Sequence, residues 1–321
     1  MVKLILIFIL CVINANLAWA KSQLNVITSL SSHDPMYKGL ERFKLLVESK
    51  TDQQVEIRLF VGSQLGNDED ILEQAMAGTN VAVLVDGGRL STYQREIGIL
   101  GAPYLLQNMS QLDKLVESKL FQSWAEKLQN KNHLKVLAFN WWQGSRHLLT
   151  NKAIDQPEDL AGVRMRTVGA PIWIESIKAM GATPTPLSFT EVYSGLQQKV
   201  LDAAEAQYDA IYGARLYEVT SHITKTSHIQ LISGLVTSAG WFDSLTPQQQ
   251  SIITESAAIA GRFATHIVQS NESQIEQELR QQGLTINKID LAPFVEATTS
   301  VYETLGYSEL REQVYEVLRD E

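Results

Sequence analysis

Three short apolar stretches decide the fold, and they read LNVI (24–27), VEIRLF (55–60) and VAVLV (81–85). Each has the length of a strand, and the second alternates apolar with charged residues as a half-buried strand does. The two segments between them have helical periodicity, and Asp34 and Asn67 stand where helix N-caps are needed. The order β-α-β-α-β predicts a parallel, doubly wound α/β sheet, in which ligands bind beyond the carboxyl ends of the strands.

The remaining chain continues to alternate strands and helices. We expect helices over about 111–129, 171–180 and 247–282 and from about 308. A further helix is expected to begin at a capping box at 188–191. Strands are expected over 135–139, 162–167, 200–203 and 284–289. The stretch WWQGSR (141–146) crowds aromatic rings, a glycine and a cation together, and we place a crossover there. Since no Pro-rich or Gly/Ser-rich linker separates the units, two α/β lobes joined by crossing strands are the simplest interpretation.

Length and composition limit the protein class. The chain has 321 residues, which at roughly 100 to 200 residues per domain predicts two domains. Its 45% hydrophobic and 20% charged residues are typical of a globular protein. Lys and Arg number 27 against 36 Asp and Glu, and no basic run could follow a phosphate backbone, so we expect no nucleic-acid partner.

The first 20 residues have the form of a secretory signal peptide. Lys3 precedes an apolar run over 4–12, and Ala18-Trp19-Ala20 supplies an A-x-A cleavage site, so we expect the mature chain to begin at Lys21. The alternative is an uncleaved membrane anchor, but Asn14 and Asn16 interrupt the run well short of the roughly 20 apolar residues that a spanning helix needs. No other segment is long enough to span a membrane.

The single cysteine, Cys11, lies within this signal peptide. The mature protein is therefore expected to contain no disulfide, no catalytic thiol and no thiolate metal ligand. An exported, acidic protein that needs no disulfide fits the bacterial periplasm best.

Catalytic and metal-binding signatures are absent from the sequence. It contains no G-x-S-x-G, H-E-x-x-H, G-x-x-x-x-G-K-[ST] or G-x-G-x-x-G, and its 6 histidines show no ligand spacing. We therefore expect no cofactor and no metal site.

Arg166 is the strongest candidate for a ligand-binding residue. It lies at the carboxyl end of the predicted strand over 162–167, whose apolar members Val163 and Met165 point to the other face. A guanidinium group stays charged and matches both oxygens of a carboxylate, so an arginine facing a crevice is suited to holding an organic acid. The alternative, an interlobe salt bridge or a solvated arginine, stays open.

Arg146 is expected to end another strand in the same way, so that the two arginines straddle the cleft between the lobes. Two cations facing one crevice in an acidic protein indicate an anionic small ligand. Nearby aromatic residues that either wall this pocket or belong to the core are Trp141, Trp142, Trp173 and Phe189.

A series of stretches resembles one known family across the mature chain. They are SQLG (63–66), APYL (102–105), GSRH (144–147), DLAGVRMRT (159–167), GATPTP (181–186) and FTEVY (189–193). In this order and spacing they resemble the substrate-binding proteins of TRAP transporters, the tripartite ATP-independent periplasmic carriers of organic acids. The resemblance implies a two-lobe periplasmic-binding-protein fold that closes over its ligand about a hinge of crossing strands and a helix. We expect lobe I to comprise 21–143 plus about 232–271, and lobe II to comprise 144–231 plus about 272–321.

The resemblance also assigns site residues. The family's carboxylate-binding arginine falls on Arg166 and a second, less uniform arginine on Arg146, while Phe189 matches a ring that packs against the ligand. Residues expected to line the cleft from the first lobe and the crossover are Trp142, Asp68, Asp86 and Arg89. Asp86 with Arg89 is similar to members that bind hydroxylated sugar acids, although the two residues could equally pair with each other.

One segment departs from the family pattern. Where many relatives have Asp-Gly-Gln-Glu-Asn, this chain has DAAEAQ (202–207), so the amide expected at position 206 is absent. Gln207 and Glu205 are the candidate replacements, and the substrate cannot be carried over from relatives that use that amide.

The function expected from these observations is that of a periplasmic TRAP binding protein, not an enzyme and not itself membrane-embedded. It would capture a C4-dicarboxylate, a sugar acid or a related carboxylate through Arg166 and pass it to the membrane subunits. Two alternatives stay open: a secreted hydrolase or lyase with Glu205 or Asp86 as general base, and a ligand-sensing partner of a signalling receptor.

Overall fold

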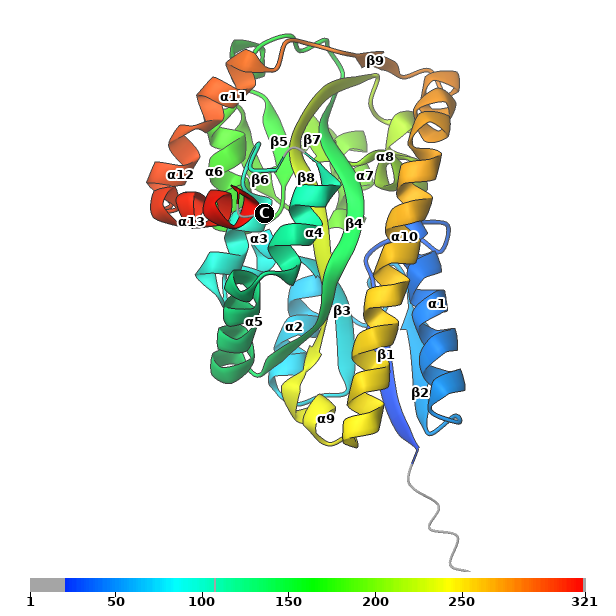
Figure 1. Cartoon of the computed structure of the whole chain (residues 1–321). Coiled ribbons are helices and arrows are strands. Elements are labelled where there is room, and N and C mark those ends of the chain that lie inside the picture. The colour runs from blue at the N-terminus through cyan, green and yellow to red at the C-terminus, as the bar shows by residue number, and fades with distance from the viewer. Residues whose placement is uncertain (1–20, 107, 320–321) are drawn as a thin grey trace, which may run out of the picture.

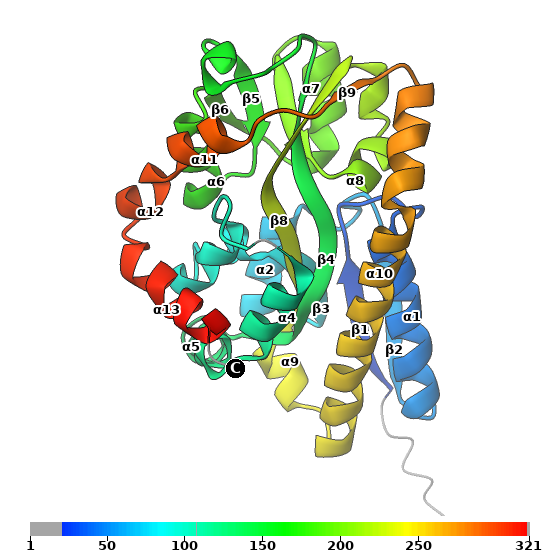
Figure 2. The same cartoon turned by 45° about the horizontal axis from the view of Figure 1, so that its top comes forward.

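The structure is a computed structural model that describes residues 21–106 and 108–319 (Figure 1). The predicted signal peptide, with Cys11, lies outside the described residues. Within them, one 9-stranded sheet has the order β2-β1-β3-β8-β4-β7-β5-β6, with β9 beside β8. The helices flank this sheet on both sides (Figures 1 and 2).

The first half of the sheet matches the predicted β-α-β-α-β unit. Its elements are β1 (Ser22–Ile27), α1 (Pro35–Lys50), β2 (Val55–Phe60), α2 (Asp68–Met76) and β3 (Val81–Asp86). The backbone N–H of Met36 donates to Asp34 at 2.8 Å, and Asn67 forms a capping box with Asp70, so both predicted caps are confirmed. Strand β1 pairs in parallel with both β2 and β3, which brings the chain segments after β1 and β3 to one edge of the sheet.

Two long antiparallel strands connect the halves. They are β4 (Leu134–Thr150) and β8 (His222–Ser238), each of 17 residues (Figure 2). The strand predicted over 135–139 covers only part of β4, and β8 was not predicted from the sequence. Strand β4 continues through the 141–146 segment because β-bulges absorb its irregularities, one of them between Trp142 and Gly144, whose φ is +108°. Arg146 therefore lies within β4, and the expectation that it ends a strand is wrong.

The second half is built from shorter elements. They are β5 (Arg164–Thr167), α6 (Pro171–Ala179), β6 (Thr183–Pro186), α7 (Val192–Gln197), β7 (Ala203–Ala206) and α8 (Tyr208–Gly213). Strand β7 therefore begins at Ala203, where the strand expected over 200–203 was to end. The expected capping box is absent, because the Ser188 hydroxyl donates to the Glu191 carboxylate at 2.5 Å and a 3₁₀ turn (Phe189–Glu191) precedes α7.

The helix expected over 111–129 is two helices, α4 (Met109–Glu117) and α5 (Lys119–Asn132). Ser118 separates them and caps the second by accepting a hydrogen bond from the backbone N–H of Phe121. The short elements of the chain are α3 (Gly87–Leu90), α9 (Ala239–Asp243) and 3₁₀ helices at Arg95–Gly101, Pro157–Leu160 and Leu216–Glu218.

The C-terminal part spans both halves. Helix α10 (Pro247–Gln281) confirms the predicted long helix and lies along one side of the molecule in both views (Figures 1 and 2). It is followed by β9 (Thr285–Asn287), α11 (Ala292–Thr298), α12 (Ser300–Thr304) and α13 (Ser308–Arg319) on the other side. Among the described helices, none combines the length and the apolar character needed to cross a membrane.

The hydrophobic core is divided between the halves. One large cluster is centred on β1, β3 and α1 and includes Val314 of α13, whereas Phe294 of α11 belongs to a smaller cluster with Met165 of β5. A further small cluster lies around Ile211 of α8. The C-terminal segment therefore packs against both halves, and the predicted residue boundaries of the lobes stay a prediction.

Candidate functional site

A polar cavity lies where the two halves of the sheet meet. It holds about 490 Å³ of space between its lining side chains, including space open to solvent. Its polar and charged lining residues are Thr28, Ser29, Asp68, Asp86, Arg89, Gln143, Arg146, Arg166, Gln207 and Ser233. They come from both halves of the molecule: from the segment after β1, the start of α2, the end of β3 and α3, strands β4, β5 and β8, and the residue after β7.

The structure brings most of the predicted site residues together here. Those that line the cavity are Asp68, Asp86, Arg89, Arg146, Arg166, Phe189 and Gln207. Trp142 and Glu205 do not line it. The indole of Trp142 instead donates to Gln230 Oε1 at 3.2 Å, and Glu205 lies behind Arg146. Of the other aromatic candidates, Trp173 lines the cavity and Trp141 belongs to the core.

Arg166 is buried and has no ionic partner among the residues that the structure describes. Its position in β5, between β6 and β7, leaves its side chain 1% exposed. The Nε–H donates to the carbonyl of Leu187 at 2.9 Å, but among the described residues Nη2 has no hydrogen-bond partner. Burial lowers the pKa of Arg166 to about 9, which leaves the group charged at neutral pH. A buried cation without a partner is unfavourable, so this arrangement is chemically suited to binding an anion.

Arg146 is neutralised within the protein. Its guanidinium donates to the carboxylate and the backbone carbonyl of Glu205, and to Gln207 Oε1 at 3.0 Å. Its charge also lies 4.8 Å from the ring centre of Trp173. Arg146 is therefore held rigidly against the cavity wall.

Glu205 has the properties of a counter-ion. Burial, the largest single effect, would raise its pKa, but the charge of Arg146 together with the contacts of Arg146 and His228 lowers the pKa to about 2. A carboxylate so weakly basic at neutral pH is a poor general base, which disfavours Glu205 in the enzyme alternative.

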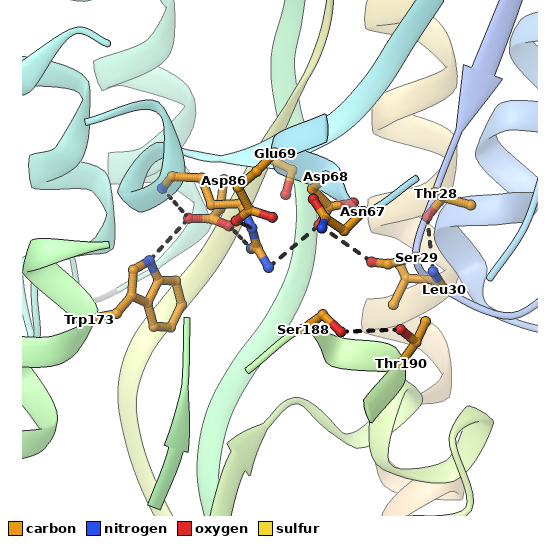
Figure 3. A network of polar contacts seen from close by, with 12 residues as sticks. Thr28, Ser29, Leu30, Asn67, Asp68, Glu69, Asp86, Trp173, Ser188 and Thr190 are labelled. Atoms are coloured by element: carbon orange, nitrogen blue, oxygen red, sulfur yellow. Dashed lines mark hydrogen bonds and ion pairs between the residues drawn. The ribbon is translucent and has the colours of Figure 1, made fainter. Parts of the chain in front are cut away.

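Arg89 is surrounded by carboxylates. It contacts Asp86, Glu69 at 2.9 Å and Asp68 at 3.5 Å, so the alternative in which Asp86 and Arg89 pair with each other is confirmed. Asp86 also accepts hydrogen bonds from the backbone N–H of Arg89 at 3.0 Å and from Trp173 Nε1 at 3.1 Å. Figure 3 shows Trp173 reaching toward Asp86 from a different segment of the chain.

Asp68 is the second lining residue with an unused atom. Its Oδ2 lies 3.5 Å from both Arg89 and the Ser29 hydroxyl, whereas Oδ1 is buried and has no hydrogen-bond partner in the described part of the chain. Burial raises the pKa of Asp68 to about 6, against the opposing charge of Arg89. The group is therefore mainly ionised at neutral pH.

A neutral polar chain forms another part of the wall. Gln207 Nε2 donates to Gln143 Oε1 at 2.9 Å, and Gln143 Nε2 donates to the Ser233 hydroxyl at 2.6 Å. Four of the polar lining residues were not predicted from the sequence: Gln143, Ser233, Thr28 and Ser29. Thr28 and Ser29 directly follow the carboxyl end of β1, where ligands bind in doubly wound sheets, so their position was a signal in the sequence. Ser233 lies on β8, the strand that was not predicted.

Within residues 21–106 and 108–319, the geometry presents no metal site. The described residues contain no group of three or more His, Cys, Asp or Glu side chains placed to hold a metal ion.

Comparison with protein families identifies one model that covers most of the chain. It is DctP, described as bacterial extracellular solute-binding protein, family 7, and it matches residues 27–309. Among curated proteins, the 2,3-diketo-L-gulonate-binding periplasmic protein YiaO of Escherichia coli is 27% identical over 269 residues, which are 83% of this chain and 81% of that protein.

Solved structures include two informative neighbours. A TRAP periplasmic solute-binding protein from Escherichia fergusonii, in an apo open structure, is 46% identical, covers 92% of this chain and 99% of its own, and has a TM-score of 0.81. A TRAP periplasmic solute-binding protein from Actinobacillus succinogenes with bound L-galactonate is 28% identical, covers 92% of this chain and 100% of its own, and has a TM-score of 0.88.

Proposed function

This chain belongs to the bacterial extracellular solute-binding proteins of family 7, the binding proteins of TRAP transporters, and we propose that it captures a small organic acid through Arg166. Closure of the two lobes would enclose the acid, and the loaded protein would deliver it to the membrane subunits of its transporter. The proposed location is the periplasm, after removal of the signal peptide.

The observation that carries this proposal is the state of Arg166. It is 1% exposed, it lines the cavity, and no carboxylate in the described part of the chain pairs with it. A ligand carboxylate would supply the missing charge and the missing acceptor for Nη2. In the proposed site, Phe189 adds an apolar surface beside Arg166, since its ring centre lies 5.7 Å from that guanidinium.

Relatives favour sugar acids among the candidate ligands. The Actinobacillus structure contains bound L-galactonate, and YiaO is a 2,3-diketo-L-gulonate-binding protein. We therefore place sugar acids ahead of C4-dicarboxylates for this chain.

A thermal-shift screen tests the proposal. The protein, purified from the periplasm of an expression host and freed of bound acid, is heated with sugar acids, C4-dicarboxylates, 2-oxo and hydroxy acids, and aromatic acids. A ligand at 100 times its dissociation constant should add about 2.7 kcal/mol to the free energy of unfolding. If no acid of any class raises the melting temperature, the proposal is wrong.

The contact with Arg166 is tested by calorimetry on the acid that the screen finds. Arg166→Ala should weaken binding by roughly 2–5 kcal/mol, because the ligand carboxylate would be buried without its partner. Arg164→Ala is the matched control, since Arg164 lies two residues earlier on the same strand, is 47% exposed and pairs with Asp202. Equal affinities for wild type and Arg166→Ala would remove Arg166 from the site.

A further inference from the structure

A second site lies in the second half of the molecule, away from the cavity between the halves. We propose that this groove binds an amphipathic anion, a small molecule with a hydrocarbon body and one negatively charged head group. The groove has a volume of about 590 Å³, which lies within the roughly 300–1,000 Å³ of small-molecule sites. The side chains that carry the argument are Lys152, Val163, Leu196, Lys199, Leu201 and Val219.

Strands β5 and β7 separate the groove from the cavity. Val163 directly precedes β5 and Asp202 directly precedes β7, and both residues line the groove. Arg166 on β5 and Gln207, which follows β7, line the cavity instead. The two strands are parallel and have 4 residues each, a length of about 13 Å. The two sites therefore lie at opposite ends of the same strands.

The floor of the groove is apolar. Val163, Leu196 and Leu201 are buried side chains of the small hydrophobic clusters of this half, and Val219 and Tyr193 pack partly buried against one of them. The cavity between the halves has instead a lining of many polar and charged side chains. A hydrocarbon body placed on the floor of the groove would leave water and gain apolar contacts, which is favourable.

The two carboxylates of the groove are already neutralised. Asp202 forms an ion pair with Arg164 at 2.8 Å. Glu218 forms an ion pair with Arg215 at 2.5 Å and also accepts a hydrogen bond from the Tyr193 hydroxyl at 2.8 Å. Neither carboxylate therefore balances a further cation in the groove.

The two lysines of the groove have no carboxylate partner. Lys152 and Lys199 are exposed, and neither forms an ion pair with any residue that the structure describes. Lys152 Nζ donates only to the backbone carbonyl of Asp159, at 2.6 Å. The charged lining residues and their ion-pair partners thus comprise four cations and two carboxylates, in a chain whose net charge is −9.

The charge and the floor together define the ligand. A negatively charged head group would be attracted by Lys152 and Lys199 while its hydrocarbon body covers the floor. A cationic amphiphile of the same length would be repelled, and an uncharged one would gain nothing from the lysines. A short acid would lack the contact with the floor.

Four probes separate these requirements in calorimetric titrations of the protein below the micelle concentration of each amphiphile. Decanoate has the body and the negative head, decanol has an uncharged head, decyltrimethylammonium has a positive head, and acetate has the head without the body. Decanoate should bind at least tenfold more tightly than each of the other three. Added sodium chloride should weaken its binding, because salt screens charges at an exposed rim.

A charge reversal locates the bound decanoate. The double variant Lys152→Glu with Lys199→Glu should bind decanoate at least tenfold more weakly than wild type. The control is Lys131→Glu with Lys288→Glu, which changes the net charge equally at exposed lysines that form no ion pair with described residues and do not line the groove. The control should bind as wild type does, and thermal melts of both double variants verify folding.

Arg166→Ala distinguishes the groove from the cavity. Decanoate has a carboxylate, so it could occupy the cavity at Arg166, whereas binding in the groove should be the same in Arg166→Ala and wild type. Loss of decanoate binding in Arg166→Ala would overturn the inference. So would the absence of binding to wild type, equal affinities for the three ten-carbon probes, or wild-type affinity in Lys152→Glu with Lys199→Glu. None of these results bears on the capture of an organic acid by the cavity, so the proposed function would stand or fall separately.

Discussion

Arg146 and Arg166 line the same cavity, yet their neighbours give them different chemistry. Glu205 and Gln207 occupy the donors of Arg146, so this cation is balanced before any ligand arrives. Arg166 donates to the Leu187 carbonyl and keeps an unused Nη2. Since only an unbalanced charge gains a full ionic partner on binding, the ligand carboxylate is expected at Arg166.

Asp34 should make the stability of the protein depend on pH. Burial, which outweighs the hydrogen bond from the Met36 N–H, raises its pKa from 3.8 to about 7. Between these values the folded state binds more protons than the unfolded state, so stability falls as pH rises from about 4 to about 7 and stays reduced above 7. Asp34→Asn keeps the helix cap without the charge and should stabilise the protein by roughly 1–3 kcal/mol at pH 8.

Urea unfolding of wild type and Asp34→Asn from pH 4 to pH 8 measures this effect. The difference between the two proteins should grow with pH and disappear near pH 4. The exposed Asp243, changed to Asn, serves as the control for the loss of one carboxylate. A destabilised Asp34→Asn at pH 8 would show that the charge of Asp34 supports the fold.

Residues of the site were predictable where the signal is local. Arg166 follows from strand alternation, because Val163 and Met165 mark the buried face and leave the arginine on the other. The pairing of Arg146 with Glu205 spans 59 positions in the sequence and depends on β4 lying beside β7, so one sequence could not indicate it. The hydrogen-bonded residues Gln207, Gln143 and Ser233 also lie far apart in the sequence, so one sequence could not indicate that they contact one another.

At the scale of elements, helices with strong caps were predicted and long strands were not. Helices α1, α2 and α10 begin at residues whose own side chains satisfy the first N–H groups, which is a local property. Strands β4 and β8 stabilise each other across the sheet, and bulges interrupt the periodicity of β4. Their extent is therefore set by pairing between distant segments, which no short window of sequence contains.

Helix α6 must dock against α3 to close the cavity as seen here, and Gly88 makes that docking possible. A Cβ atom at Gly88 would lie 1.8 Å from Nε1 of Trp173, the atom that donates to Asp86. Gly88→Ala should therefore prevent this arrangement and weaken binding of the ligand at least tenfold. The melting temperature without ligand should change little, because an open arrangement does not need the contact.

Calorimetry measures the ligand affinity of Gly88→Ala, and thermal melts of the same preparations measure its melting temperature without ligand. Gly240→Ala is the matched control, because the nearest atom to a Cβ there is the Ser238 hydroxyl at an ordinary 3.7 Å. Wild-type affinity in Gly88→Ala would mean that ligand binding does not require the indole of Trp173 to pack against residue 88.

At the scale of the whole molecule, the structure differs more from an open, ligand-free relative than from a ligand-bound one. It superposes better on the L-galactonate-bound relative than on the open, ligand-free one, although the open one has the higher sequence identity. The contact between Trp173 and Asp86 across the cavity agrees with closure. Strands β4 and β8 and helix α10 run through both halves, so they are the elements about which the halves would turn.

Closure without a ligand should be disfavoured by Arg166, since it would bury a cation that has no ionic partner in the described part of the chain. Small-angle X-ray scattering of the wild type should therefore show a larger radius of gyration without ligand than with it. Arg166→Met removes the charge and keeps an apolar side chain of similar length, so this variant should be compact without ligand and insensitive to its addition. Arg164→Met, at the exposed position on the same strand, should behave as the wild type does. If ligand-free wild type already scatters as the closed structure does, the unpaired cation does not control closure, and the contacts between α6 and α3 would be sufficient to hold the halves together.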